Sequence, residues 1–218
     1  MRSIVYNQDC LEAMRQMPDK AFDLAIVDPP YGLGHRWIRP GENCHAAAAM
    51  AGSQWDNFAP SDEYFTQLVR VTKNQIIWGG NHFNLAPTRG IIIWDKPTMR
   101  IPTMADGELA WTSFDRPLKI VSVSNSVVER IHPTQKPVAL YRWLLTNYAK
   151  PGDTILDTHL GSGSSRIAAY DLGFDFTGYE LDKDYFEAQE KRFADHIVQP
   201  KLFGPTPAIV TQEAMFAV

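Results

Sequence analysis

The stretch TILDTHLGSGSSRIAAYDLGFDFTGYE occupies residues 154–180 and decides the fold class. It predicts a buried strand over 154–157, a glycine-rich turn, a helix over 165–172 and a second strand over 176–180. In doubly wound α/β folds such a unit binds the nucleoside part of a cofactor, because glycines let the backbone approach the ligand closely. The acid that ends the second strand, Glu180, is then placed to accept hydrogen bonds from ribose hydroxyls.

The glycine-rich turn by itself is a weak signal. Residues 161–166 lack the third glycine of the dinucleotide fingerprint, and the chain contains no Gly-Lys-Ser/Thr phosphate loop. At this point an ordinary tight turn therefore remains open as an alternative to a cofactor site.

A second chemical signal follows another buried strand. Residues 22–27 are almost continuously apolar and lead into Asp28-Pro29-Pro30-Tyr31, where two prolines end the strand. In open α/β folds ligands bind at this carboxyl edge of the sheet. The rigid turn offers two acceptors, the Asp28 carboxylate and the Pro29 carbonyl oxygen, beside the flat ring of Tyr31. These groups suit a planar substrate with an exocyclic amino group, and a proline-stiffened turn is the structural alternative.

The rest of the chain alternates between strand and helix patterns, which predicts an α/β fold with a mostly parallel sheet and helices on both faces. Residues 95–131 are expected to be irregular apart from a strand over 119–123. Trp78 and Trp94 end apolar runs and are expected in the core. The other expected strands are 4–6, 75–78 and 91–94, and the other expected helices are 11–17, 61–71, 138–148 and 183–196.

Composition and length bound the class of protein. The 218 residues suggest one domain, and 44% hydrophobic and 21% charged residues are ordinary globular values. No apolar run approaches the roughly 20 residues that cross a bilayer. Cys10 and Cys44 provide neither a disulfide framework nor a zinc spacing. We therefore expect a cytoplasmic protein with no membrane segment and no metal.

Charge is distributed unevenly along the chain. The net charge of −4 divides into −2 over residues 1–86, +4 over 87–150 and −6 over 151–218. A basic middle segment suits contact with phosphates while the rest of the surface stays acidic. Chance asymmetry is the alternative.

Three motifs together resemble the permuted β-class of DNA amino-methyltransferases, which use S-adenosylmethionine. They are Asp28-Pro29-Pro30-Tyr31, His132-Pro133-Thr134-Gln135-Lys136-Pro137 and Asp157-Thr158-His159-Leu160-Gly161-Ser162-Gly163, and residues 8–10 and 17–19 fit the family's opening. The resemblance covers most of residues 3–195. Since the catalytic tetrapeptide precedes the cofactor loop, it implies a Rossmann-like methyltransferase fold with a circularly permuted motif order.

The resemblance implies roles for the tetrapeptide. Asp28 and the Pro29 carbonyl oxygen would accept the hydrogens of the target amine, with Pro30 completing the rigid turn. Tyr31 would stack on a base flipped out of double-stranded DNA, because the amino group is unreachable inside the stack. No covalent nucleophile is needed.

The resemblance also implies a cofactor site. Asp9 would lie near the cofactor adenine, and Thr134 and Lys136 near its methionine end. His159 stands where the family usually has Phe, so a local hydrogen-bonding role and a direct cofactor contact are both open. The full set of expected cofactor-binding residues is Asp9, Thr134, Lys136, Asp157, His159, Gly161, Ser162, Gly163 and Glu180.

The expected activity is methylation of adenine N6 in DNA, because the Asp form of the tetrapeptide is more usual for adenine and the Ser form for cytosine. Methylation of cytosine N4 or of RNA, and a catalytically silent binding subunit, are the alternatives. One domain is expected over residues 1–200, with a mobile loop over 34–57 and a small target-recognition region over 96–131. Residues 201–218 are expected to be a peripheral tail. The family resemblance also allows a homodimer.

Overall fold

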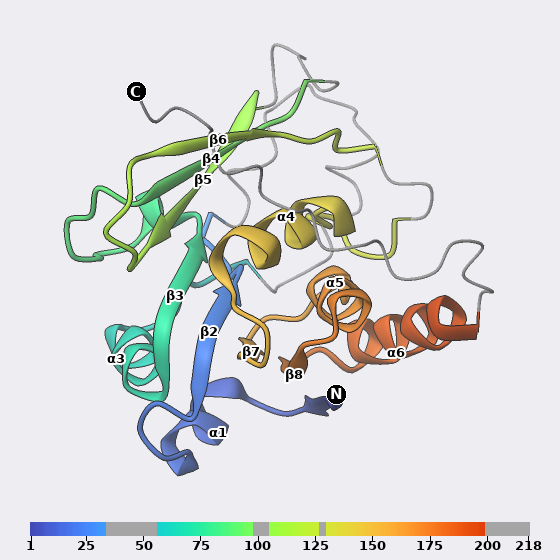
Figure 1. The fold of residues 1–218 in the computed structure, drawn as a ribbon. Helices are drawn as coiled ribbons and strands as arrows, with labels where there is room; N and C mark the ends of the chain where they lie inside the picture. The colour runs from blue at the N-terminus through green and yellow to red at the C-terminus, as the bar shows by residue number, and fades with distance from the viewer. Residues whose placement is uncertain (34–55, 98–104, 127–129, 199–218) are drawn as a thin grey trace, which may run out of the picture.

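A sheet of eight strands runs through the residues that the computed structural model describes, which are 1–33, 56–97, 105–126 and 130–198 (Figure 1). Each pair of neighbouring strands is parallel except the two pairs that include β5, so the predicted mostly parallel sheet is confirmed. In order across the sheet, the strands are β1 (Ser3–Asn7), β8 (Asp175–Glu180), β7 (Thr154–Asp157), β2 (Phe22–Val27), β3 (Thr72–Trp78), β5 (Gly107–Thr112), β4 (Ile91–Asp95) and β6 (Lys119–Ser122).

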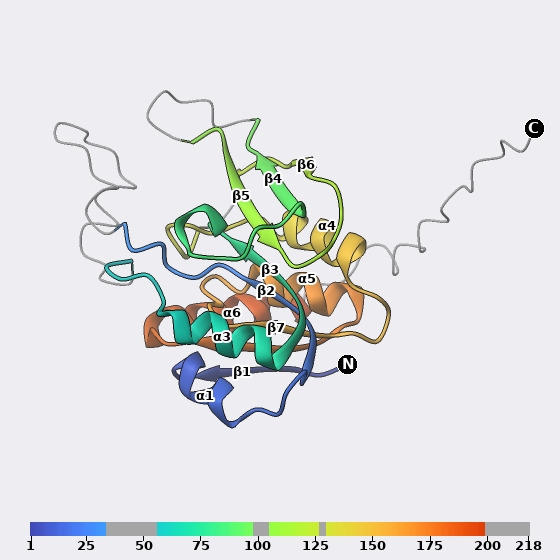
Figure 2. The same cartoon turned by 90° about the vertical axis from the view of Figure 1, so that its left-hand side faces the viewer.

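Helices cover both faces of this sheet, as expected. In Figures 1 and 2, α1 and α3 lie on one face, while α4 and α5 lie on the other with α6 beside α5. The helical elements are α1 (Cys10–Gln16), α3 (Asp62–Val71), the short 3-10 turn η2 (Gly80–His82), α4 (Val138–Tyr148), α5 (Ser164–Leu172) and α6 (Lys183–Val198).

The two faces explain why β2 is apolar over its buried residues, 24–27. Leu24 and Ile26 belong to the core under α4 and α5, whereas Ala25 and Val27 belong to the core under α1 and α3. Successive side chains of a strand point to opposite faces, so the part of a strand that is covered on both faces needs apolar residues at successive positions. Trp78 and Trp94 are also fully buried, which confirms their prediction as core residues.

Strand β5 corrects the sequence analysis. Residues 95–131 were expected to be irregular apart from one strand, and this prediction is wrong for Gly107–Thr112. The segment GELAWT combines a glycine and a glutamate with apolar residues, so its local pattern for a strand is weak. Antiparallel pairing with β3 on one side and β4 on the other stabilises it instead. The predicted strand in the same region, β6, is present.

The carboxyl ends of the parallel strands meet at one edge of the sheet and bring the motifs together. Asp28 follows the end of β2, and Asp157 and Glu180 end β7 and β8. Because β5 runs in the opposite direction, its first residues lie at this same edge, and Glu108 pairs with Trp94 near the end of β4. Functional side chains distant in sequence are therefore neighbours here.

Two predicted segments fall on residues that the structure does not describe. The loop over 34–57 lies outside the described residues except for Asp56 and Asn57, and the tail over 201–218 lies wholly outside them. Within the described ranges, no helix combines the length and apolar character needed to span a bilayer.

Candidate active site

The turn of the predicted catalytic tetrapeptide, residues 28–31, is held by a buried carboxylate. Asp56 accepts hydrogen bonds from three successive backbone N–H groups, at 2.6 Å from Tyr31, 3.0 Å from Gly32 and 3.2 Å from Leu33. A carboxylate that accepts several backbone N–H bonds fixes the path of the chain strongly. Asp56 was not predicted, because no local pattern connects it with a turn 25 residues earlier.

Tyr31 is positioned by contacts around its ring. Its hydroxyl donates to Asp28 Oδ1 at 2.8 Å, and its ring stacks on His82 with centroids 4.8 Å apart and lies edge-on to Phe83. Burial raises the pKa of Tyr31 well above its ordinary value, so the hydroxyl stays protonated and remains a donor. Tyr31 thus orients the Asp28 carboxylate.

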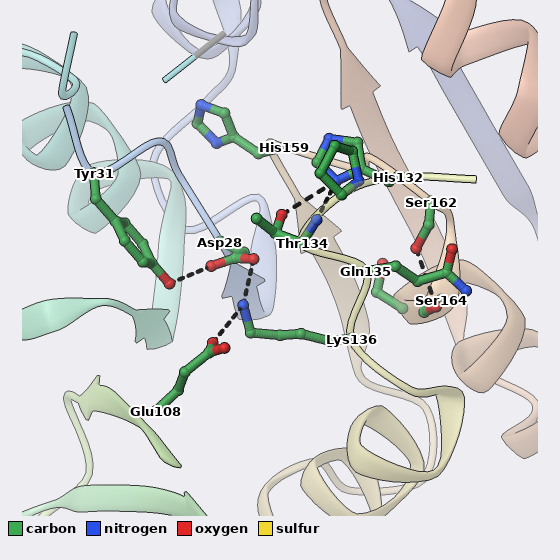
Figure 3. A network of polar contacts seen from close by, with 12 residues as sticks. Asp28, Tyr31, Glu108, His132, Thr134, Gln135, Lys136, His159, Ser162 and Ser164 are labelled. Carbon is green, nitrogen blue, oxygen red and sulfur yellow. Dashed lines mark hydrogen bonds and ion pairs between the residues drawn. The ribbon is translucent and has the colours of Figure 1, made fainter. Parts of the chain in front are cut away.

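A cluster of buried charges surrounds Asp28 (Figure 3). The Lys136 ammonium group contacts Asp28 Oδ2 and lies 3.0 Å from Glu108 Oε2. Glu108 Oε1 in turn pairs with Lys96 Nζ at 2.5 Å. The Lys136 side chain is only 3% exposed, and its ammonium lies 5.2 Å from the centre of the Trp78 ring. Lys136 is therefore shared between two carboxylates.

The charges in this cluster depend on one another. Burial raises the pKa of Asp28, and the positive charge of Lys136 opposes this shift. Burial also disfavours ionisation of Glu108, but the charges of Lys136 and Lys96 outweigh it and lower the Glu108 pKa. For Lys136, burial is outweighed by the two carboxylates, which raise its pKa. Glu108 and Lys136 are thus both charged at neutral pH.

Two findings here go beyond the sequence analysis. The resemblance assigned Lys136 to the methionine end of a cofactor, whereas its ion pairs in the structure are with Asp28 and Glu108. Glu108 was not predicted, because the strand that contains it was not predicted. The one signal for it was an acid between Gly107 and Leu109 in an otherwise apolar stretch.

The glycine-rich turn contacts Glu180 directly. The Gly161 backbone N–H donates to Glu180 Oε2 at 2.7 Å, and Glu180 Oε1 accepts from the Asp182 N–H at 2.9 Å. Gly161 and Gly163 have φ values of +50° and +71°, which L-residues with a side chain rarely adopt. The turn and the end of β8 thus form one hydrogen-bonded unit.

Asp157 is fixed at the beginning of the same turn. Its Oδ1 accepts from the His159 N–H at 3.1 Å and its Oδ2 from Ser165 Oγ at 2.5 Å. Ser162 Oγ lies 3.1 Å from Ser164 Oγ, so the turn is linked to the first residue of α5. Burial raises the pKa of Asp157 to about 7.

The raised pKa predicts that Asp157 makes folding stability depend on pH. An acid whose folded-state pKa lies above its unfolded value contributes stability at low pH that is lost as pH rises through the folded pKa. The measured quantity is the free energy of unfolding of Asp157→Asn minus that of the parent. We expect this difference to increase by about 2–3 kcal/mol between pH 5 and pH 8. Urea unfolding of the cofactor-free proteins measures this difference.

The comparison with the variant is needed because two histidines act in the opposite direction. Burial lowers the pKa of His132 and of His159 to about 4. Through these two groups, the folding stability of the protein decreases as pH falls. Their contribution cancels in the difference between parent and variant. A difference that stays constant between pH 5 and 8 would contradict the assignment to Asp157.

His159 is hydrogen-bonded locally. Its Nδ1 lies 3.0 Å from Thr158 Oγ1 and 3.5 Å from Tyr64 Oη, and Tyr64 also lies 2.6 Å from Thr158 Oγ1. Tyr64 packs edge-on against the His159 ring, with centroids 5.3 Å apart. Of the two roles considered for His159, the local one is thus present, and a cofactor contact stays a prediction. Tyr64 was not predicted to lie here.

The motif that begins at His132 lies against the glycine-rich turn. Thr134 bonds to His132 Nδ1 through its backbone N–H at 3.3 Å and its hydroxyl at 3.1 Å. A Cβ atom added to Gly161 would lie 3.6 Å from the His132 ring, which also packs against Tyr185. The structure therefore brings together Thr134 and Gly161, two of the predicted cofactor residues.

Asp9 has a clear structural role. Its Oδ1 caps α1 by accepting from the Leu11 N–H at 2.7 Å and the Glu12 N–H at 3.1 Å. It follows β1, whose last residue Asn7 pairs with Glu180 in the next strand. Its predicted proximity to the cofactor adenine is compatible with this position at the carboxyl edge and stays a prediction.

Cys10 is the cysteine that lies within the described residues. Burial raises the pKa of the Cys10 thiol to about 12, which removes the thiolate form at neutral pH. Across the parts of the chain that the structure describes, no group of three or more His, Cys, Asp and Glu side chains is arranged to hold a metal ion.

Comparison with known proteins agrees with the motifs. A family model described as DNA methylase matches residues 77–191, just over half of the chain. The chain is 24% identical over 249 aligned positions to the type II methyltransferase M2.MboI of Moraxella bovis, covering 91% of this chain and 89% of that protein.

Solved structures share the fold. M1.HpyAVI, solved as a complex with SAM, superposes with a TM-score of 0.59 at 21% identity, covering 87% of this chain and 98% of that one. The cytosine-N4-specific PvuII DNA methyltransferase superposes with a TM-score of 0.58 at 16% identity, covering 87% and 85%. The fold of this chain is thus the Rossmann-like α/β fold of these methyltransferases.

Proposed function

Because this chain belongs to the DNA methylase family, we propose that it transfers a methyl group from S-adenosylmethionine to the exocyclic N6 of an adenine flipped out of DNA. The observation that supports the base assignment is the tetrapeptide at residues 28–31, whose first residue is Asp. Its carboxylate lies at the carboxyl edge of β2 with the Tyr31 hydroxyl bonded to it.

The residues at the glycine-rich turn fit S-adenosylmethionine. Gly161 and Gly163 adopt the positive φ values that shape this turn, and the Glu180 carboxylate lies beside the turn for ribose hydroxyls. Asp157, His159, Ser162 and Thr134 complete the proposed set around it, with Asp9 at the adenine end. The cofactor supplies a methyl group made electrophilic by its bond to a sulfonium sulfur.

The chain's own groups hold and polarise the target amine. Asp28 and the Pro29 carbonyl oxygen accept the two amine hydrogens, which leaves the nitrogen lone pair free to face the methyl carbon. Pro30 keeps this turn rigid, and Tyr31 stacks on the flipped base. The Asp28 carboxylate then stabilises the positive charge that develops on the amine nitrogen, which is the preorganised electrostatic effect that accounts for much of catalysis.

Cytosine N4 is the second candidate target, because the fold is shared with an enzyme described as cytosine-N4-specific. Labelled S-adenosylmethionine incubated with unmethylated duplex DNA, followed by digestion and nucleoside analysis, separates the two. We expect label in N6-methyl-2′-deoxyadenosine. Label in N4-methyl-2′-deoxycytidine would overturn the base assignment, and absence of label in any DNA nucleoside would favour RNA or a silent subunit.

We also place target recognition in residues 96–131. Of this range, the structure describes β5 and β6 as strands of the central sheet. The excess of basic residues over the wider segment 87–150 supports contact with phosphates.

Glu180→Ala is expected to weaken cofactor binding by about 1–3 kcal/mol, the contribution of a charge-assisted hydrogen bond. Part of this loss comes from the turn itself, because the Gly161 N–H loses its acceptor. Isothermal titration with S-adenosylmethionine measures the effect. Glu187→Ala is the matched control, since Glu187 is an exposed acid on α6. Equal dissociation constants for the two variants would contradict the role of Glu180.

A further inference from the structure

Glu108 is the carboxylate of the cluster that no motif includes. It comes from β5, the antiparallel strand, and it reaches the edge where β2 and β3 end. Its two carboxylate oxygens contact two different ammonium groups, Lys96 on one side and Lys136 on the other. The Lys136 ammonium is thereby held on the line between Glu108 and Asp28, as Figure 3 shows.

We propose that Glu108 is a positioning residue for methyl transfer: it shares the Lys136 ammonium with Asp28, so that this ammonium fixes the Asp28 carboxylate without neutralising it. The inference rests on the proposed function, in which Asp28 faces the target amine. It assigns Glu108 to the reaction through Lys136 and not through contact with the substrate.

Electrostatics explains why a second carboxylate is needed. Asp28 and Lys136 alone form a neutral pair, and the ammonium would then oppose the positive charge that develops on the amine nitrogen. Glu108 places a second negative charge beside the Lys136 ammonium, 3.0 Å from it, while Lys96 pairs with the other Glu108 oxygen on the far side and makes the four-group cluster neutral. At short range and with little exposure to water, such interactions are weakly screened. Glu108 therefore offsets the Lys136 charge close to Asp28, while the ion pairs orient the Asp28 carboxylate.

A purely structural ion pair is the competing explanation, and pH separates the two. Methyl transfer needs ionised Asp28, so its pKa sets the acid limb of the rate profile. Glu108 raises the pKa of Asp28 and Lys136 lowers it, beneath the larger effect of burial. Tyr31 also lowers the Asp28 pKa through its hydrogen bond, and the Asp28 charge in turn raises the pKa values of Tyr64, Tyr141 and Asp157 on neighbouring elements.

The experiment measures kcat for methyl transfer to DNA against pH in Glu108→Gln, Lys136→Met and the parent. We expect Glu108→Gln to shift the midpoint of the acid limb about one pH unit lower. Lys136→Met is expected to shift this midpoint about one pH unit higher. At the plateau, Glu108→Gln is expected to lower kcat about ten-fold, although its Asp28 ionises more readily. Loss of the Glu108 charge alone would move the limb without lowering the plateau, so the plateau kcat reports the positioning of Asp28.

Glu63→Gln is the matched control, because Glu63 of α3 forms an exposed ion pair with Arg15 of α1. We expect it to leave the profile unchanged. An acid limb in Glu108→Gln that coincides with the parent's, or that moves higher, would overturn the proposal. So would a plateau kcat equal to that of Glu63→Gln.

A second measurement does not depend on activity. Carbon-13 NMR of labelled carboxyl groups in the parent, with Asp28 and Glu108 assigned by substitution, follows their titration directly. The proposal requires Glu108 to remain ionised at the pH where Asp28 takes up its proton, and the reverse order would overturn it. Label in cytosine or no label in DNA would instead count against the proposed function, so the two failures are distinguishable.

Discussion

Asp28→Ala is expected to lower the rate of methyl transfer a thousand-fold or more, while the affinity for S-adenosylmethionine changes by less than about two-fold. Asp28 bonds to Tyr31 and Lys136, and none of its described hydrogen bonds goes to the glycine-rich turn at 161–163. Its removal takes away both an acceptor for the amine and the charge that stabilises the developing cation, and preorganised donors or acceptors of this kind contribute about 10²–10³ each. Single-turnover methyl transfer and isothermal titration measure the two quantities separately.

Asp19→Ala provides the control for this variant. Asp19 is an exposed acid beyond the end of α1, and it pairs with Arg70 of α3. Its loss is expected to change neither the rate of methyl transfer nor the affinity for S-adenosylmethionine. If Asp28→Ala lost cofactor affinity in parallel with its rate, the separation between a substrate-binding turn and a cofactor-binding turn would be wrong.

Gly79→Ala is expected to destabilise the protein by about 2–4 kcal/mol and to reduce activity at least a hundred-fold. Gly79 has a φ of +67°, and a Cβ atom there would lie 2.2 Å from the Tyr31 ring. The ring would have to move, and the hydroxyl that orients Asp28 would move with it. Urea unfolding and methyl-transfer assays on the same preparations measure both effects.

Gly152→Ala separates backbone strain from the steric clash. Gly152 also has a positive φ, +89°, but no atom lies within 4 Å of the Cβ position there. Its substitution should therefore cost only the backbone term, about 1–2 kcal/mol, and leave activity intact. If Gly79→Ala were no worse than Gly152→Ala in stability and activity, close packing of Tyr31 on Gly79 would not matter.

The sequence by itself determined most of the sheet and the place of the site within it. Continuous apolar runs such as residues 22–27 identified strands covered on both faces, because such strands cannot tolerate polar positions on either side. The glycines at 161 and 163 and the prolines at 29 and 30 marked the turns, since these residues restrict or extend backbone freedom locally. Signals of this kind are encoded within about ten residues, so they are readable without a structure.

The tertiary structure alone decided which charges meet at Asp28. β5 was missed because its stability comes from pairing with β3 and β4, whose paired residues lie 12 to 36 positions earlier in the chain. With β5 unrecognised, Glu108 could not be placed at the carboxyl edge, and Lys136 was assigned to the cofactor alone. Asp56 escaped notice for the same reason, since it bonds to a turn about 25 residues away.

Side-chain partners of this type depend on the direction and order of strands, which local sequence patterns do not specify. The order β7-β2-β3-β5 places the ends of four strands, drawn from residues 22–157, side by side at one edge. Local propensity therefore predicted the elements and their turns. Long-range pairing decided the electrostatic environment of Asp28, because burial and neighbouring charges act through space and not along the chain.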